Sequence, residues 1–296
     1  MKVLLTGASG YLGRHVLRAL RAQGLEVVLL GRQVPPEGTG LPWIEADLLA
    51  PGGLGPRLLE AQATHLLHLA WYVEHGLYWT SDLNLRWADA SLRLLQAFGE
   101  AGGQRAVLAG TCAEYDWAQG YCVEEVTPCH PATLYGVAKH ATHQMAQAWC
   151  ALHGVSLAWG RLFFTYGAGE HPNRLIPSLI EVFQGRRSPF GVHAEAYRGF
   201  LPVAEAASAF VALLASQAGG SFNICSGQPV QLKQLVQVLA QVAGADPGPV
   251  LGLSQVRPHE PRLLVGSVER LRAVTGWQPV LSLEQGLRQI VAPDLA

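Results

Sequence analysis

The chain is poor in lysine, in charge and in long apolar runs. Of its 21 basic residues only three are lysines, Lys2, Lys139 and Lys233, and charged residues make up 15% of the 296 residues. The net charge of −1 and the lack of a basic stripe argue against a nucleic-acid partner. The sequence has no run of about 18 apolar residues, so we expect no membrane span.

Paired cysteines and a leader segment are missing as well. The five cysteines form no CxxC pair, which argues against a zinc framework and suits a reducing cytoplasm. The chain passes from Met1 and Lys2 straight into "VLLTGASG", without the apolar segment and cleavage site of a secretory signal. We therefore expect a cytoplasmic protein.

The first half of the chain alternates short apolar runs with longer segments of helical periodicity. We expect strands at "KVLLTG", "EVVLLGR", "THLLHLA" and "RAVLAG", and long helices over 81–102 and 131–154. This alternation predicts an α/β, Rossmann-type fold with a doubly wound parallel sheet. After about residue 165 the pattern becomes irregular. We expect an NAD(P)-binding domain over 1–164 and a smaller, irregular C-terminal substrate lobe over 165–296, which can interleave with the first domain.

A glycine-rich turn joins the first strand to the first helix. "TGASGYLGRHV" places Gly7, Gly10 and Gly13 three residues apart. Glycine permits the tight turn and the close approach of a pyrophosphate, and the helix start offers N–H groups to an anion. The turn therefore predicts dinucleotide binding.

The end of the second strand bears on which dinucleotide binds. An acidic residue there would hold the ribose 2′-hydroxyl of NAD, whereas an arginine would accommodate the 2′-phosphate of NADP. The strand ends in "LLGRQV", with Arg32 and no carboxylate, and Arg14 could add a second positive group. We expect NADP, with NAD as the alternative.

One of the scarce lysines lies four residues after a tyrosine in a helical segment. Tyr135 and Lys139 in "PATLYGVAKHA" share one helix face. We expect the ammonium to lower the pKa of the phenol, so that Tyr135 can act as a general acid or base. Thr111 follows the strand "RAVLAG", at the sheet edge where such folds bind ligands. The three residues are our candidate catalytic group.

The motifs, taken together, resemble the extended short-chain dehydrogenase/reductase superfamily, in its nucleoside-diphosphate-sugar epimerase/dehydratase/ketoreductase branch. "TGASGYLG" is similar to TGxxGxxG, "HLLHLAW" to the HLAA strand, and "RLFFTYGAGE" to RxxNVYGPG. "YRGFLPV", "FNICSG" and the closing "RPHEP…GWQPVLSLEQGL" also match. Thr111, Tyr135 and Lys139 match the catalytic Ser/Thr, Tyr and Lys of that superfamily.

The resemblance also implies binding residues. It implies that the cofactor contacts Gly7, Gly10, Tyr11, Leu12, Gly13, Asp47, Leu48, Leu69, Ala70, Trp71, Asn84, Tyr135, Lys139 and Phe163. It implies that the substrate diphosphate, nucleotide or ribose contacts Arg198, Arg257 and Glu260. The segment "EHPNRLIP" adds Asn173 and Arg174 as candidate substrate contacts.

Several positions depart from the pattern. The asparagine of RxxN is Phe164, so one expected diphosphate contact is absent. The sugar 4,6-dehydratases carry Asp-Glu after the catalytic threonine, where this chain has Cys112 and Ala113, which argues against a dehydratase. His140 and His143 are spaced for a shared metal, but no third ligand is evident from the sequence, so we expect no metal.

We therefore expect an NAD(P)-dependent oxidoreductase or epimerase acting on a nucleotide-activated sugar, most simply a 4-ketoreductase. A 4-epimerase with tightly bound NAD is the alternative. A small-carbonyl reductase and a non-catalytic dinucleotide-binding protein also remain open. The resemblance further implies a homodimer formed through the helices over 81–102 and 131–154.

Overall fold

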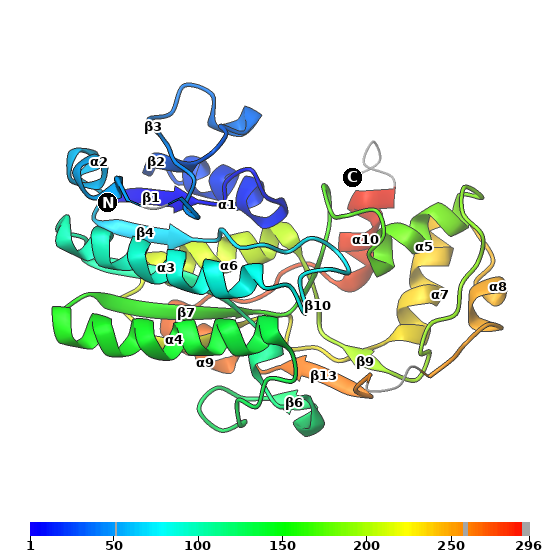
Figure 1. Ribbon diagram of the computed structural model, residues 1–296. Coiled ribbons are helices and arrows are strands. Elements are labelled where there is room, and N and C mark those ends of the chain that lie inside the picture. Colours follow the sequence, from blue (N-terminus) through cyan, green and yellow to red (C-terminus); the bar gives the residue numbers. More distant parts are fainter. Residues whose placement is uncertain (51, 257–259, 292–296) are drawn as a thin grey trace.

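The computed structural model describes residues 1–50, 52–256 and 260–291 (Figure 1). Within these residues the largest layer is a sheet of seven parallel strands. From edge to edge the strands are β11 (Gly220–Ile224), β7 (Ser156–Leu162), β5 (Arg105–Thr111), β4 (His65–His68), β1 (Lys2–Thr6), β2 (Glu26–Gly31) and β3 (Trp43–Glu45). This arrangement confirms the Rossmann-type parallel sheet.

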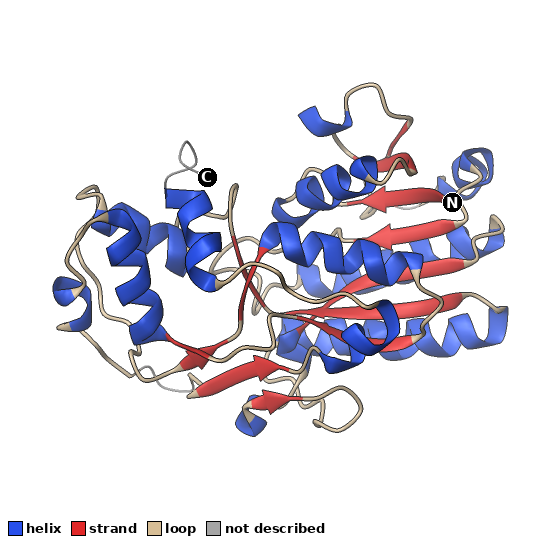
Figure 2. Ribbon diagram, turned by 180° about the vertical axis from the view of Figure 1, so that it is seen from behind, coloured by secondary structure: helices blue, strands red, loops and turns tan. Residues whose placement is uncertain are grey.

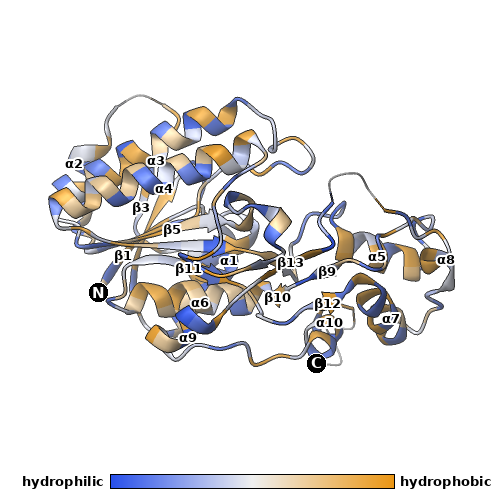
Figure 3. Cartoon of the chain, turned by 90° about the horizontal axis from the view of Figure 1, so that it is seen from below, coloured by the Kyte–Doolittle hydropathy of each residue, from blue (hydrophilic) through white to orange (hydrophobic). Residues whose placement is uncertain are grey.

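Helices cover both faces of the sheet, as the buried, two-sided strands require (Figure 3). Along β1, Val3 and Leu5 belong to one apolar cluster, while Leu4 belongs to the cluster on the opposite face. The first cluster includes residues of α1 (Tyr11–Ala22) and α6 (Val203–Ala215). The second includes residues of α2 (Leu54–Ala61), α3 (Leu83–Glu100) and α4 (Leu134–His153).

The bounds of α4 follow from its flanking residues. The Thr133 side chain accepts a hydrogen bond from the Gly136 N–H at 3.1 Å, which caps the start of the helix. Gly154 ends it with φ of +69°, in the left-handed region. The expected helix over 131–154 is therefore present with slightly shorter ends, and it places Tyr135 in its first turn.

A smaller lobe lies beyond the carboxyl ends of the main strands (Figure 1). Its helices are α5 (Leu175–Phe183), α7 (Leu232–Ala243), α8 (Gly248–Leu251) and α10 (Leu283–Val291). Its short strands pair in the order β12 (Val230–Gln231), β9 (Tyr197–Arg198), β13 (Leu263–Gly266) and β6 (Tyr121–Cys122). A separate parallel pair, β8 (Phe164–Tyr166) and β10 (Phe200–Pro202), lies between the two parts (Figure 2).

The second half of the chain returns to the main sheet. β11 pairs with β7, and α6 packs against α1, although both elements follow residue 165. Leu271 of α9 (Glu269–Thr275) joins the same apolar cluster. The division at residue 164 stays a prediction. The segments after it contribute to the main sheet with its covering helices as well as to the smaller lobe. No helix in the described ranges is long and apolar enough to cross a membrane.

Candidate active site

The turn between β1 and α1 is closely packed. Gly7 has φ of +74°, where side chains are rarely tolerated. A Cβ at Gly7 would lie 2.7 Å from the Ala70 nitrogen, and a Cβ at Gly13 would overlap the Gly7 carbonyl. Gly10 caps α1 without a side chain, so the first N–H groups of the helix face the turn. This cradle, which added Cβ atoms would fill, fits the pyrophosphate of a dinucleotide.

The segment after β4 is held by one asparagine. Asn84, buried in the first turn of α3, accepts a hydrogen bond from the Trp71 Nε1 at 2.9 Å. Its amide nitrogen donates to the Tyr78 carbonyl at 2.7 Å and to the Ser81 carbonyl at 2.9 Å. Asn84 therefore positions Trp71 and the loop behind it. Leu69 and Ala70 lie beside the glycine turn, as the close approach of Gly7 shows.

The candidate catalytic residues meet at the end of β5. Thr111 ends this strand, and Tyr135 lies opposite it in the first turn of α4. Burial raises the pKa of Tyr135, and a hydrogen bond with the Thr111 side chain acts in the opposite direction. The Tyr135 ring packs against Tyr78 and Trp79, with ring centroids 4.9 and 5.8 Å away.

Lys139 lies one turn further along α4 and is almost completely buried. Its Nζ donates to the Ala109 carbonyl at 2.7 Å and lies 3.8 Å from the centre of the Trp71 ring. Burial lowers the pKa of Lys139 to about 7. Our expectation that the ammonium lowers the pKa of Tyr135 is not met here, because burial of the phenol dominates and raises that pKa.

A cavity of about 250 Å³ lies between the sheet edge and the smaller lobe. Tyr78 and Trp79, which pack on Tyr135, form part of its wall on the sheet side. Apolar side chains such as Ile176 and Phe200 line the lobe side. A concave, largely apolar site with a few polar groups is the usual form of a small-molecule site.

Two ion pairs supply charge to the lobe side of this cavity. The Arg198 Nη2 lies 3.0 Å from the Glu260 Oε1, and the Arg174 Nε lies 3.2 Å from the Glu170 Oε1. All four residues line the cavity. Of the remaining substrate candidates, Asn173 is exposed and does not line it, and Arg257 lies outside the described residues.

Glu170 was not among our candidates. Its side chain is 5% exposed, and burial raises its pKa to about 7 in spite of the nearby Arg174 guanidinium. The Glu170 Oε2 and the Tyr11 hydroxyl are both buried without a hydrogen-bond partner in the described structure. Burial and the charge of Glu170 raise the pKa of Tyr11, the first residue of α1, so the Glu170 carboxylate lies near the start of that helix. Its sequence neighbourhood, a loop after a short strand, gave no distinct signal.

The other cofactor candidates are spread along the sheet edge. Arg32 is exposed just after β2. A second cavity of about 290 Å³ near the start of α1 is lined by Tyr11, Arg14 and Arg18 among others. The remaining candidates differ in burial. Asp47 is exposed in a turn, Leu48 and Phe163 are buried, and Leu12 is partly buried against the core.

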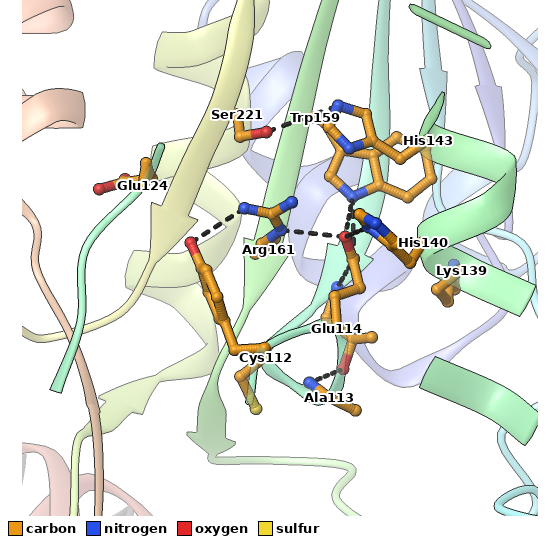
Figure 4. Close-up of polar contacts among 12 residues, drawn as sticks. Cys112, Ala113, Glu114, Glu124, Lys139, His140, His143, Trp159, Arg161 and Ser221 are labelled. Atoms are coloured by element: carbon orange, nitrogen blue, oxygen red, sulfur yellow. Dashed lines mark hydrogen bonds and ion pairs between the residues drawn. The ribbon is translucent and has the colours of Figure 1, made fainter. Parts of the chain in front are cut away.

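A buried polar network behind Thr111 was also missed (Figure 4). Glu114, in the 3-10 turn Cys112–Glu114, contacts the Thr111 backbone, Trp159 and Arg161. The signal was present in "TCAE", since a threonine followed three residues later by glutamate is the pattern of a capping box. Glu114, His140 and His143 also bring ligand-type atoms within 4.8 Å of one another. Glu114 is paired with Arg161 at 2.9 Å, whereas the Nδ1 atoms of His140 and His143 have no hydrogen-bond partner in the described structure.

Comparisons with known proteins agree with this geometry. Residues 3–225 match the sequence model of the NAD dependent epimerase/dehydratase family. A GDP-6-deoxy-D-mannose reductase of Pseudomonas aeruginosa is 29% identical over 98% of this chain and 96% of its own length. A UDP-glucose 4-epimerase of Azospirillum brasilense is 27% identical over 98% and 94%. The structure of a Thermus thermophilus UDP-glucose 4-epimerase complex with NAD is 25% identical, covers 98% of both chains and has a TM-score of 0.83.

Proposed function

Because the chain belongs to the NAD dependent epimerase/dehydratase family, we propose that it is an NADP-dependent reductase of the 4-keto group of a nucleoside-diphosphate sugar. The observation that carries this proposal is the grouping of Thr111, Tyr135 and Lys139 at the end of β5, with Tyr135 packed on Tyr78 and Trp79 of the cavity wall. The relative named for reduction of a GDP-sugar, which matches almost the whole chain, supports the same reaction.

The chemistry divides between cofactor and protein. The nicotinamide, when bound, supplies the hydride that adds to C4 of the sugar. The oxygen of the former carbonyl then needs a proton, and the Tyr135 hydroxyl donates it. Thr111 holds the same oxygen by a hydrogen bond. Lys139, one helical turn away, holds the hydroxyl groups of the cofactor ribose, as the resemblance implies.

The lobe side of the cavity suits the diphosphate. Arg198 and Arg174 present guanidinium groups there, and such groups bind phosphate oxygens with two parallel hydrogen bonds. Each arginine is paired with a carboxylate, Glu260 or Glu170. The bound phosphates would compete with these carboxylates for the guanidinium groups.

The preference for NADP rests on two positive residues. Arg32 follows β2, where the adenosine ribose is held in this fold, and Arg14 lines the neighbouring cavity. Titration of protein fluorescence with each reduced dinucleotide tests this preference. NADPH is expected to bind more tightly than NADH, and equal affinities would contradict the role of Arg32.

The reaction is tested by following nicotinamide absorbance with purified protein, NADPH and a nucleoside-diphosphate-4-keto-6-deoxysugar. We expect loss of NADPH together with one hydroxy-sugar product. If NADPH is not consumed with the 4-keto sugar on any nucleoside diphosphate, the ketoreductase proposal is overturned. Turnover of simple aldehydes or ketones instead would indicate a small-carbonyl reductase. That alternative stays open because Phe164 stands where the family motif has a diphosphate-binding asparagine.

A 4-epimerase is the second candidate. Its support is the similarity to two UDP-glucose 4-epimerases, one of them solved with NAD. Such an enzyme would oxidise and reduce C4 in one cycle without net consumption of cofactor. Interconversion of 4-epimers by the protein alone, with no added dinucleotide, would favour this function over the reductase. Dinucleotide binding without either reaction would indicate a non-catalytic protein.

We also propose a homodimer formed through α3 and α4. Leu85 on α3 and Val137, Met145 and Leu152 on α4 are exposed apolar residues of the kind that protein interfaces cover. Sedimentation equilibrium is expected to give twice the mass of the chain, and a monomer at micromolar concentration would contradict the dimer. A cytoplasmic location stays part of the proposal and rests on the five free cysteines.

A further inference from the structure

Glu114 is a carboxylate with no exposed surface, and Figure 4 shows it together with Trp159 and Arg161. Its Oε1 accepts hydrogen bonds from the Thr111 N–H at 2.8 Å and from the Trp159 Nε1 at 2.9 Å. Its Oε2 accepts from the Arg161 Nε at 2.9 Å. A buried carboxylate is costly unless it is paired and hydrogen-bonded, and Glu114 meets both conditions.

These contacts fix the turn that presents Thr111. The Thr111 side chain accepts a hydrogen bond from the Ala113 N–H at 3.2 Å, which completes a reciprocal cap with Glu114. Gly110 provides the necessary space, because a Cβ there would lie 2.6 Å from the Glu114 Oε1. The direction of the Thr111 hydroxyl therefore depends on Glu114.

The charge of Glu114 also reaches the other two residues. It raises the pKa of Lys139, which favours the ammonium form, and it raises the pKa of Tyr135, which favours the neutral phenol. Both effects favour the protonation states that a proton donor and its cationic neighbour need.

Other titratable groups face this region from several elements. They are His68 on β4, Tyr78 before α3, Cys112 in the turn, His140 and His143 on α4, Arg161 on β7 and, beyond Cys112, Arg198 on β9.

Most of these groups are uncharged near neutral pH. Burial lowers the pKa of His68 and of His143 to about 3 and lowers that of His140 as well. Burial raises the pKa of Tyr78 and of Cys112 to about 12. Apart from Arg198 beyond Cys112, the charges near the candidate catalytic group are therefore those of Glu114, Arg161 and Lys139.

We propose that the buried Glu114–Arg161 pair is a positioning unit for the reaction, holding the turn that presents Thr111 to Tyr135. This inference rests on the proposed function of the same site. Arg161 holds the carboxylate in its orientation, and Glu114 acts through Thr111, Tyr135 and Lys139 without contacting the substrate.

Glu114→Gln tests the proposal, because the amide keeps the shape of the side chain and removes its charge. We expect kcat to fall about 10- to 100-fold, with the KM of the sugar changing less than about threefold. We also expect the alkaline limb of the pH profile to move toward lower pH by about half a unit or more, since Lys139 loses its charge more readily.

Glu124→Gln is the matched control. Glu124 is also a buried carboxylate and accepts the Asn223 N–H at 2.6 Å, but it belongs to the loop after β6. This variant is expected to keep the wild-type pH profile. If Glu114→Gln and Glu124→Gln lose activity equally and neither shifts the profile, Glu114 is a structural residue only.

A double variant covers the case in which Glu114→Gln does not fold. Glu114→Gln/Arg161→Met removes both charges, so no buried charge is left without its partner, a change that folded proteins often tolerate. We expect kcat to fall as in Glu114→Gln, because Thr111 loses the same support, while the pH profile shifts less, because loss of the Arg161 charge opposes loss of the Glu114 charge. A folded double variant with wild-type kcat would overturn the proposal.

Dinucleotide binding separates this proposal from the proposed function. The affinity for NADPH is measured against pH for wild type and for both Glu114 variants, since we expect Lys139 to contact the cofactor. If wild type turns over no sugar nucleotide, the proposed function fails, but a shifted pH dependence of binding would still support the effect of Glu114 on Lys139. If Glu114→Gln shifts neither the pH dependence of NADPH affinity nor the pH profile of the rate, the effect of Glu114 on Lys139 is contradicted.

Discussion

The two sides of the candidate active site are built in different ways. On the sheet side, behind the cavity wall that Tyr78 and Trp79 form, Thr111 and Lys139 are buried and hydrogen-bonded to the backbone near the end of β5. On the lobe side, Arg198 and Arg174 line the cavity and are held mainly by carboxylates across loops and short strands. The sheet side is fixed by backbone geometry, and the lobe side by charges that can change partners.

This difference suggests a division of work. Groups that transfer a proton must be placed accurately, and burial in a regular layer achieves that. Groups that recognise an anion can begin in an ion pair and exchange it for phosphate oxygens. We therefore expect changes on the sheet side to lower kcat and changes on the lobe side to raise KM.

The largest effect is expected for Tyr135→Phe. Loss of the hydroxyl removes the proton donor, and kcat should fall roughly 10²- to 10⁴-fold. Dinucleotide affinity and the KM of the sugar should stay close to wild type. Tyr121→Phe, at an exposed tyrosine on β6, is the matched control and should be fully active. If Tyr135→Phe raised the KM of the sugar by as large a factor as it lowered kcat, the sheet side would not act in the chemical step alone, and the expected difference between the two sides would be contradicted.

Gly7→Ala should nearly abolish dinucleotide binding. The new Cβ would collide with the Ala70 nitrogen and force the turn open, and we expect an affinity loss on the order of 100-fold. Gly24→Ala is the control, because Gly24 has φ of +68° but no atom within 4 Å of its added Cβ. That variant should lose about 1–2 kcal/mol of stability and bind normally. Equal losses of dinucleotide affinity in the two variants would indicate that backbone strain, and not the collision with Ala70, causes the effect.

On the lobe side, Arg198→Met should raise the KM of the nucleotide sugar about 10- to 100-fold while kcat changes only a few-fold. The substitution removes a charged hydrogen-bond donor to the diphosphate and leaves Glu260 unpaired. The control is Arg288→Met, which removes only an exposed pair with Glu284 one helical turn away. A fall in kcat with an unchanged KM would assign Arg198 to the chemical step.

The smallest effect concerns stability and pH at Glu170. Its pKa is about 7 in the fold against an ordinary value of 4.5, so the folded state binds this proton more tightly than the unfolded chain does. The resulting destabilisation is absent below pH 4.5, grows as the pH rises to 7 and is complete above it. Glu170→Gln should therefore add roughly 1–3 kcal/mol at pH 8 and little at pH 4.5. Thermal unfolding at both pH values measures this, and an equal gain at both would contradict the titration.

The sequence was most informative where signals are local. The glycine spacing, the apolar strands and the i, i+4 relation of Tyr135 and Lys139 depend on residues close along the chain, and the sheet brings Thr111 to the same edge. The helix bounds are accurate for the same reason, since Thr133 and Gly154 mark the ends of α4.

The rest depends on contacts between distant segments. Arg198 meets Glu260, and Glu114 meets Trp159 and Arg161, only because separate strands pair in three dimensions. The pKa of Tyr135 was misjudged because spacing shows its neighbours along the helix but not how deeply the ring is buried. The high pKa of Glu170 follows from burial too, which a loop sequence does not encode locally.

The return of the chain to the main sheet limits how this enzyme can be re-engineered. Because α6, β11 and α9 complete the central layer, the smaller lobe consists of separate excursions from it. These are β6, then α5 and β9 before α6, then β12, α7, α8 and β13 between β11 and α9, and α10 after α9. A donor lobe from another enzyme could not be attached at one junction, since a single cut at residue 164 would remove an edge strand and a covering helix. Transfer of substrate preference would require grafting the excursions separately onto an intact host.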